Sequence, residues 1–213
     1  LAKDADMGLA TADLGEVWEL SKVTIKPLPA CHFTHACADA AAILRDRHSL
    51  RVADIAAVRA LVPAEVVKTV CEPVATKKRP QNSYDAQFSI PYTVATALAK
   101  GRFGLAELDD AALRDEQVLA LAAKVEYEVD PDSPFPTYYS GEVVVTLNDG
   151  RELRHREHIN RCAADRPISN ADVERKFFEN MQLVTSAARA AQVRDLVLAI
   201  DRILLDNMSH EMM

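Results

Sequence analysis

The sequence predicts an α+β fold in which helices lie on one face of a mainly antiparallel sheet, in two layers. Three observations carry this prediction. The segment EVVVTLNDGRELRHRE (142–157) alternates around Asn148-Asp149-Gly150, which is typical of a β-hairpin. Apolar residues recur at helical spacing between residues 34 and 47. Two amphipathic segments, 168–181 and 186–206, follow the hairpin without a further strand pattern. The chain should therefore end in helices, with Ser169 as N-cap of the first.

The first half of the chain is predicted to begin with a strand at 22–27, stopped by Pro27 and Pro29. In the helix that follows, Thr34 is the expected N-cap, and Asp39 is expected on the solvated side with two arginines. The segment 54–63 indicates a short helix that leads into a strand, and 64–70 another short helix. We place the boundary between an α+β domain (1–157) and a C-terminal helical segment (158–213) just after the hairpin.

The middle of the chain shows a helical pattern from residue 84 to 100, with Gly101 as its C-terminal cap. Pro91 falls inside this pattern, and an internal proline costs about 3 kcal/mol of helix stability. Either the helix begins near Ser89, or the turn before Pro91 is irregular. The segments 115–125 and 124–130 are predicted as a helix and an alternating strand.

Composition limits the classes of function. The net charge of the 213 residues is 25 − 32 = −7, which argues against non-specific nucleic-acid binding. No apolar run approaches the ~18 residues of a membrane span. The four cysteines form no CxxC pair, so we expect free thiols in a reducing compartment, the cytoplasm or an organelle. The start, LAKDADMGLA, has neither an initiator Met nor a signal sequence, which suggests a piece of a longer protein.

The segment KPLPACHFTHACADAA (26–41) concentrates side chains that can carry chemistry. A metal site is one interpretation, with Cys31, His32, His35 and Cys37 as ligands. Structural zinc sites draw two ligand pairs from separate segments, and the only other pair, in HREH (155–158), lies where residues i and i+3 of a strand face opposite sides. We therefore expect no metal. Cys31 as a nucleophile lacks a nameable partner acid, so it is kept as a site-lining residue.

Anion binding with proton transfer fits this segment better. Lys26, followed by a tight turn and a helix N-terminus, would present positive charge and backbone N–H groups at one spot. His35 in the first helical turn would have its pKa lowered, which suits a neutral acid–base group. The simpler interpretation is a solvated lysine and two packed histidines.

A second candidate is YDAQFSIPYTVATALAKG (84–101). Tyr92 lies three positions after Ser89, and a phenol near the first turn of a helix could donate a proton. The competing interpretation is a core tyrosine on an amphipathic helix.

Together, KPLPACHFTHACADAA and DAQFSIPYTVATALAKG resemble the MmgE/PrpD family of 2-methylcitrate dehydratases, cis-aconitate decarboxylases and iminodisuccinate epimerases. The resemblance continues through GLAEL, the VEYEVD strand and the hairpin into RPISNADVERKF. It implies an all-helical domain plus a smaller α+β lid, with the active site between them. The part of the helical domain that precedes the lid has no counterpart here, so half an active site is expected.

The resemblance also implies roles for residues. Lys26 matches a lid lysine that reaches a substrate carboxylate, and Tyr92 matches the site tyrosine; His35 is the next catalytic candidate. Cys31 falls where some members carry a site histidine, and Cys31, His32 and Ser89 are expected to line the substrate site. The family's reactions move a proton next to a carboxylate, followed by dehydration, decarboxylation or epimerisation.

For the whole chain, these observations predict the C-terminal portion of such an enzyme, a lyase or isomerase. Its expected partners are a small di- or tricarboxylic acid, the missing N-terminal helical domain and, in the full-length form, a second copy in a homodimer. It is expected to be cytoplasmic, to need no cofactor, and to be inactive by itself. The alternative is a non-enzymatic carboxylate-binding or dimerisation module on the same scaffold.

Overall fold

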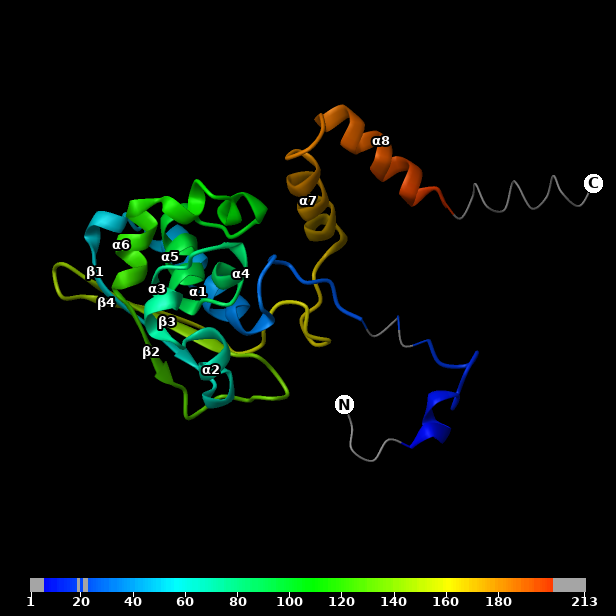
Figure 1. Cartoon of the computed structure of the whole chain (residues 1–213), viewed down its shortest axis with the longest axis horizontal. Helices are drawn as coiled ribbons and strands as arrows, with labels where there is room; N and C mark the ends of the chain where they lie inside the picture. Colours follow the sequence, from blue (N-terminus) through cyan, green and yellow to red (C-terminus); the bar gives the residue numbers. More distant parts are fainter. Residues whose placement is uncertain (1–5, 19, 21–22, 201–213) are drawn as a thin grey trace, which may run out of the picture.

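The computed structural model describes residues 6–18, 20 and 23–200. Figure 1 shows a body of helices on a sheet, with α7 beside it and α8 projecting away. The elements, in chain order, are η1 (Met7–Ala10), α1 (His32–His48), η3 (Val52–Asp54), β1 (Ile55–Val62), η4 (Ala64–Val66), α2 (Val67–Val70), α3 (Val74–Lys78), α4 (Ser83–Gln87), α5 (Ile90–Lys100), η5 (Leu105–Leu108), η6 (Ala112–Arg114), α6 (Glu116–Ala123), β2 (Val125–Val129), β3 (Gly141–Leu147), β4 (Glu152–Glu157), α7 (Asn170–Met181) and α8 (Ala187–Leu198).

The sheet has the strand order β2-β1-β3-β4. The β1–β3 and β3–β4 pairs are antiparallel, whereas β1 and β2 run parallel through the crossover that contains α2 to α6. In the register, Val58 pairs with Val145 and with Val125, so three buried valines form a row across the sheet. This arrangement confirms the predicted mainly antiparallel sheet and its 142–157 hairpin.

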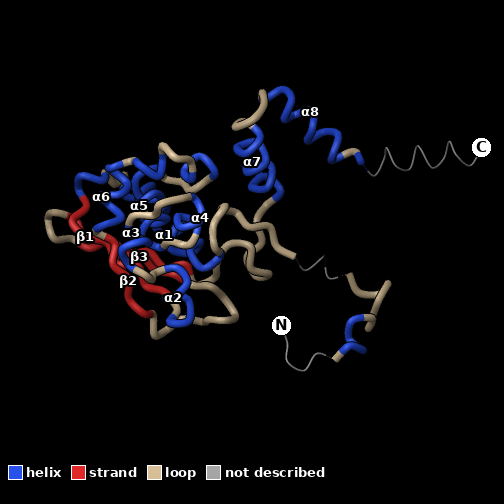
Figure 2. Tube along the Cα trace, viewed as in Figure 1, coloured by secondary structure: helices blue, strands red, loops and turns tan. Residues whose placement is uncertain are grey.

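The helices form a second layer over this sheet, seen as the blue tubes above the red strands in Figure 2. Helix α1 packs on β3 and β4, α5 packs on β2 and against α1, and α6 packs on α5. Gly141 permits the close approach of α1 to β3, because a Cβ there would lie 2.6 Å from Cys37 Sγ. The two-layer α+β class predicted from the sequence is therefore confirmed.

Helix boundaries agree with the prediction in two places and correct it in others. Gly101 ends α5 with φ +74°, and its N–H donates to the Ala97 carbonyl at 2.8 Å. The first alternative for Pro91 is confirmed, because Ser89 caps α5 and Pro91 lies in the first turn. A separate short helix, α4, precedes it.

Two expectations about the first half were wrong. Residues 23–26 are not a strand, since no neighbouring strand pairs with them; the rest of the predicted strand (residue 22) lies outside the described residues. Helix α1 begins two residues before Thr34, with Cys31 as N-cap, and the Thr34 hydroxyl donates back to the Cys31 carbonyl at 2.9 Å.

Helices α7 and α8 confirm the predicted helical tail as far as residue 198, and Ser169 caps α7 as expected. Neither helix is deeply packed: α7 has no buried residue, and α8 has one, Ala190. Among the described residues, no helix combines the length and apolar character needed to cross a membrane. The domain boundary at residue 157 stays a prediction.

Candidate functional site

The N-terminus of α1 is organised around one backbone carbonyl. The turn formed by residues 27–30 brings the Ala30 carbonyl back over the first turn of the helix, where it accepts from Lys26 Nζ at 3.4 Å and from His35 Nε2 at 3.2 Å. The Cys31 N–H donates to the Gln87 carbonyl at 2.8 Å, which ties this turn to the segment before α5. Lys26 and His35, nine residues apart in sequence, therefore share a partner.

His35 is fully buried, and burial is the main reason that its pKa falls to about 3. The neighbouring His32 and Lys26 lower the pKa further, because a proton on His35 would add a positive charge beside them. The direction agrees with the sequence-based expectation, although burial contributes more than any other cause. At neutral pH, His35 is an uncharged ring.

His32 is half-buried beside His35, with 4.8 Å between the ring centroids. Its Nε2 lies 3.1 Å from Asn160 Nδ2, and burial lowers its pKa too. Behind the histidines, the Arg161 guanidinium donates to the Asp39 carboxylate at 2.6 Å. Asp39 was predicted on the solvated side of the helix; it is buried instead, because this ion pair compensates its charge.

The arrangement suits a small anion. The Lys26 ammonium is exposed, the two histidines are uncharged but polar, and a helix of 17 residues directs its N-terminus toward the turn. Positive helix-dipole charge and a lysine at the same spot favour a carboxylate. Cys31 is half-buried at this terminus and available as a lining residue.

Tyr92 and Ser89 have other partners. The Tyr92 phenol is 1% exposed and donates to the carbonyls of Glu107 at 2.9 Å and Ala112 at 3.2 Å. Burial raises its pKa to about 12. The Ser89 hydroxyl donates to the Lys77 carbonyl and accepts from the Tyr92 N–H at 3.0 Å. The structure thus gives both side chains packing and capping contacts, with no hydrogen bond to Lys26; their place in a common site stays a prediction.

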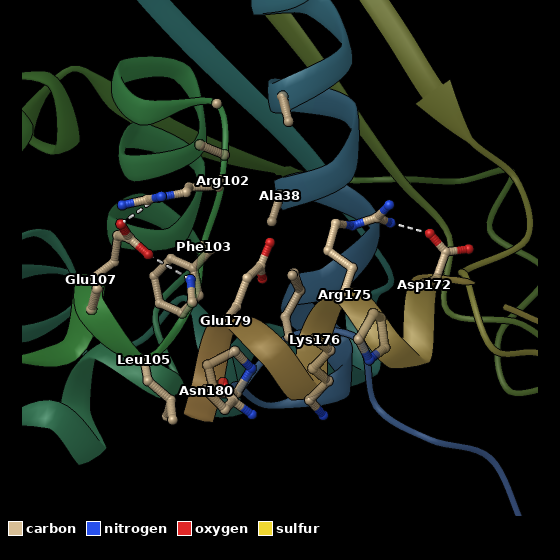
Figure 3. A pocket seen from close by; sticks show the side chains of 18 of the residues that line it. Ala38, Arg102, Phe103, Leu105, Glu107, Asp172, Arg175, Lys176, Glu179 and Asn180 are labelled. Carbon is tan, nitrogen blue, oxygen red and sulfur yellow. Dashed lines mark hydrogen bonds and ion pairs between the residues drawn. The ribbon is translucent and has the colours of Figure 1, made fainter. Parts of the chain in front are cut away.

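A cavity of about 710 Å³ lies next to this region, between α7, α1 and the loop 101–107. Figure 3 shows Arg175, Lys176 and Glu179 of α7 along one side, opposite Arg102 and Glu107. None of the six predicted site residues lines it. Its four lysine and arginine side chains already have partners: Arg102 donates to Glu107 at 2.9 Å, Arg175 pairs with Asp172, Arg161 pairs with Asp39, and Lys176 donates to the Lys26 carbonyl. The cavity is therefore a poorer anion site than the α1 N-terminus.

Sequence reasoning missed Asn160 and Arg161, which reach the α1 N-terminus from the segment after β4. The dipeptide follows the hairpin in "HINRC", and nothing in its local pattern indicates that the two side chains meet α1. The contact depends on the sheet, because α1 packs on β3 and β4 and so meets the chain that leaves β4.

Metal binding receives no support from side-chain positions. Within residues 6–18, 20 and 23–200, no three His, Cys, Asp or Glu side chains lie together as possible ligands. The four cysteines are free thiols, and burial raises the pKa of Cys71 to about 12 and that of Cys37 still further. The expectation that the chain binds no metal stays a prediction.

Comparison with known proteins gives a consistent result. The chain is 30% identical over 171 residues to human cis-aconitate decarboxylase, covering 77% of the chain and 34% of that protein. It is 29% identical over 173 residues to the Mus musculus cis-aconitate decarboxylase, covering 77% of the chain and 34% of that protein. It is 27% identical over 202 residues to the cis-aconitate decarboxylase of Aspergillus terreus, covering 90% of the chain and 40% of that protein. The chain thus spans about a third of the length of these relatives. Because the model of the MmgE/PrpD C-terminal domain matches residues 28–202, the chain belongs to the MmgE/PrpD family.

Proposed function

We propose that this chain forms one side of the active site of a lyase that acts on a small tricarboxylic acid, with decarboxylation of a cis-aconitate-like substrate as the favoured reaction. Family membership and the curated relatives, all three of which are cis-aconitate decarboxylases, support this choice over dehydration and epimerisation. The observation that carries the proposal is the meeting of Lys26, His32 and His35 at the N-terminus of α1.

The chemistry requires a cation on one carboxylate and a proton supplied to carbon. In the proposed reaction, the bond to a second carboxyl group breaks, carbon dioxide leaves, and the electron pair that stays on the substrate carbon takes up a proton. Lys26 would hold a retained carboxylate, which stabilises the negative charge that develops next to it. His32 would donate a hydrogen bond, and His35 would stay neutral and add no competing charge to the site.

The proton donor is not assigned within these residues. Tyr92 remains the candidate from the sequence, but its phenol is buried and bonded to two carbonyls. His35 has a pKa of about 3 and so carries no proton to donate from a charged ring at neutral pH. We therefore propose that the 213-residue chain binds the acid but turns it over slowly, and that acid–base groups come from additional sequence of the kind present in the longer relatives.

Binding is the sharpest test. Calorimetric titration of the chain with tricarballylate, a tricarboxylate that lacks the double bond, measures affinity without turnover. Lys26→Ala removes a charge-assisted contact of about 1.5–3 kcal/mol, which lowers affinity by about ten- to a hundredfold. Lys68→Ala removes an exposed lysine of α2 and serves as the matched control, with unchanged affinity expected. Equal affinities for Lys26→Ala and the parent chain would contradict the proposal.

Turnover is tested separately by following carbon dioxide release from cis-aconitate. The chain alone is expected to give no rate near the ~10 s⁻¹ of a typical enzyme. A rate of that order would show that the described residues contain a complete site. It would sink the proposal that additional groups are needed, while leaving the role of Lys26 intact.

The second candidate function is a non-enzymatic module that binds carboxylates or dimerises. The exposed apolar side chains of α8 favour an association surface, since Leu196, Val197 and Leu198 are each more than half exposed. Sedimentation velocity distinguishes the two: a concentration-dependent dimer that does not bind tricarballylate supports the module, and a ligand-binding monomer supports the site at α1.

A further inference from the structure

We infer that Asn160 is a positioning residue for His32: its side-chain amide holds His32 as the neutral Nδ1–H tautomer, opposite to the tautomer of His35. The inference rests on the proposed function only in its consequence for ligand binding; the tautomers themselves follow from hydrogen-bond geometry.

The orientation of the Asn160 amide is determined by its own contacts. Its Oδ1 accepts from the Tyr139 backbone N–H at 2.9 Å, and a backbone N–H can only donate. The amide nitrogen, Nδ2, must then be the group that lies 3.3 Å from the Arg161 carbonyl, which can only accept. Exchanging Oδ1 and Nδ2 would place the amide nitrogen against the Tyr139 N–H, which is also a donor, and the amide oxygen against the Arg161 carbonyl, which is also an acceptor. Asn160 therefore presents an N–H to its remaining neighbour, the His32 ring.

That neighbour is His32 Nε2, 3.1 Å from Asn160 Nδ2. Because the amide nitrogen donates, Nε2 must be the nitrogen without a proton, so the proton of the neutral ring is on Nδ1. Two aromatic neighbours restrict the ring: the Tyr139 ring lies 5.1 Å away in a T-shaped arrangement, and the His35 ring lies 4.8 Å away. Asn160 and Tyr139 thus fix both the tautomer and the position of the ring.

His35 is held in the opposite state. Its Nε2 lies 3.2 Å from the Ala30 carbonyl, which can only accept, so Nε2 carries the proton and Nδ1 is the bare nitrogen. Among the described residues, Nδ1 has no hydrogen-bond partner, although it is fully buried. The pair therefore combines one donor, His32 Nδ1–H, with one buried acceptor, His35 Nδ1.

The charges around the pair favour the uncharged state of both rings. Burial and the charge of Lys26 lower the pKa of both rings, and the charge of Arg161 lowers that of His35, whereas a hydrogen bond to the Arg161 backbone raises the pKa of His32 without outweighing burial. Asp39, the acid close to this group, is already paired with Arg161. A neutral His32 with its proton on Nδ1 has an Nδ1–H group that can donate to a carboxylate, whereas in the Nε2–H tautomer Nδ1 carries a lone pair, which repels a carboxylate.

The test reads the tautomers directly. Long-range ¹H–¹⁵N correlation spectra of the uniformly labelled chain at pH 7.5 distinguish the two nitrogens of each neutral histidine. We expect the Nδ1–H pattern for His32 and the Nε2–H pattern for His35. Observation of His32 as the Nε2–H tautomer in the parent chain would overturn the inference without any variant.

The substitution Asn160→Asp replaces the donor that faces His32 Nε2 by an acceptor. One carboxylate oxygen can still accept from the Tyr139 N–H, and the other now faces His32 Nε2 as an acceptor, so His32 should change to the Nε2–H tautomer or become charged. Asn148→Asp is the matched control, since Asn148 lies in the hairpin turn and donates to the Ala53 carbonyl. In the control, His32 should keep its Nδ1–H pattern. An unchanged His32 spectrum in Asn160→Asp would also overturn the inference.

Tricarballylate affinity, measured on the same samples, separates this inference from the proposed function. We expect at least about a tenfold loss in Asn160→Asp, from the lost donor and the added negative charge. If the tautomer changes while affinity stays the same, the role of Asn160 stands, and the proposal that His32 faces the bound acid fails. If Asn160→Asp does not fold, the spectrum of the parent chain still decides the assignment.

Discussion

The body of the molecule and its two ends differ in how deeply their apolar side chains are buried. In the body, Leu44 of α1, Ile55 of β1 and Leu98 of α5 are at most 1% exposed and belong to one continuous core. Toward the ends, Leu14 is 81% exposed, Val184 81% and Leu196 58%. Figure 1 shows the same contrast in outline, with residues 6–18 (dark blue) and helix α8 lying away from the body. The body is stabilised by contacts within the chain, whereas the ends carry the surface that another molecule or segment could cover.

The candidate site lies at the junction of these two regions. Lys26 belongs to the exposed approach to α1, His35 belongs to the core, and the Ala30 carbonyl connects them. Lys176 of α7 donates to the Lys26 carbonyl, so the helical tail also reaches this point. The core thus fixes the position of His35, whereas Lys26 lies on the exposed side of the site.

The largest effect is expected in the core. Leu44→Ala should lower the free energy of unfolding by about 2–5 kcal/mol, because it leaves a cavity under α1 that its neighbours fill only in part. Leu196→Ala, the same substitution on α8, should leave the urea midpoint of the main transition unchanged. Equal losses would contradict the division, since they would place α8 in the same cooperative unit as the body.

A smaller effect is expected from the ion pair behind the histidines. Asp39→Asn should lower the free energy of unfolding by about 1–3 kcal/mol, because it leaves the partly buried Arg161 without its counter-charge. The control is Asp54→Asn, which breaks the exposed pair with Arg51, and no measurable change in chemical denaturation is expected there. A loss in the control as large as in Asp39→Asn would show that burial does not distinguish the two pairs.

The helix caps provide the next comparison. Ser89→Ala removes the acceptor for the Tyr92 N–H and should cost about 0.5–2 kcal/mol, measured by thermal unfolding. Ser186 is the corresponding N-cap of α8, where its hydroxyl accepts from the Arg189 N–H. Ser186→Ala should not change the melting of the body. A shift in melting for Ser186→Ala but not for Ser89→Ala would reverse the assignment of stability to the two regions.

The smallest effect concerns pH. The pKa of His35 is about 3 in the folded chain and about 6.5 when unfolded, so between these values the unfolded chain binds more protons and stability rises with pH. Lowering the pH from 7 to 5.5 should therefore cost about 1 kcal/mol through His35. Over this interval, the free energy of unfolding of His35→Gln should fall by about 1 kcal/mol less than that of the parent chain. His158→Gln replaces an exposed residue, and its free energy of unfolding should change as it does in the parent chain. Parallel pH profiles for His35→Gln and the parent chain would contradict the buried neutral ring.

Local patterns in the sequence were sufficient for much of the fold. Alternation around Asn148-Asp149-Gly150 predicted the hairpin, and Gly101 and Ser169 predicted a helix end and a helix start, because turns and caps depend on residues that are adjacent in the chain. The density of Lys26, His32 and His35 around a helix start predicted an anion site, and that site stays a prediction. All of these signals act over a few residues, where backbone geometry and side-chain chemistry have a direct connection.

What the sequence left open is decided by contacts between distant segments. Asp39 looks solvated on its helix, but it is buried because Arg161, 122 positions later, reaches it after β4. Asn160 meets His32 by the same route, 128 positions apart, and thereby determines which ring nitrogen carries the proton. Tyr92 has the pattern of a site residue, yet its hydroxyl is taken by carbonyls of η5 and η6. The sequence by itself determined most of the helices and strands, since their signals are local. Only the packing of α1 on β3 and β4 decided which of these polar groups are paired, because hydrogen bonds and ion pairs form between the side chains that the tertiary structure brings together.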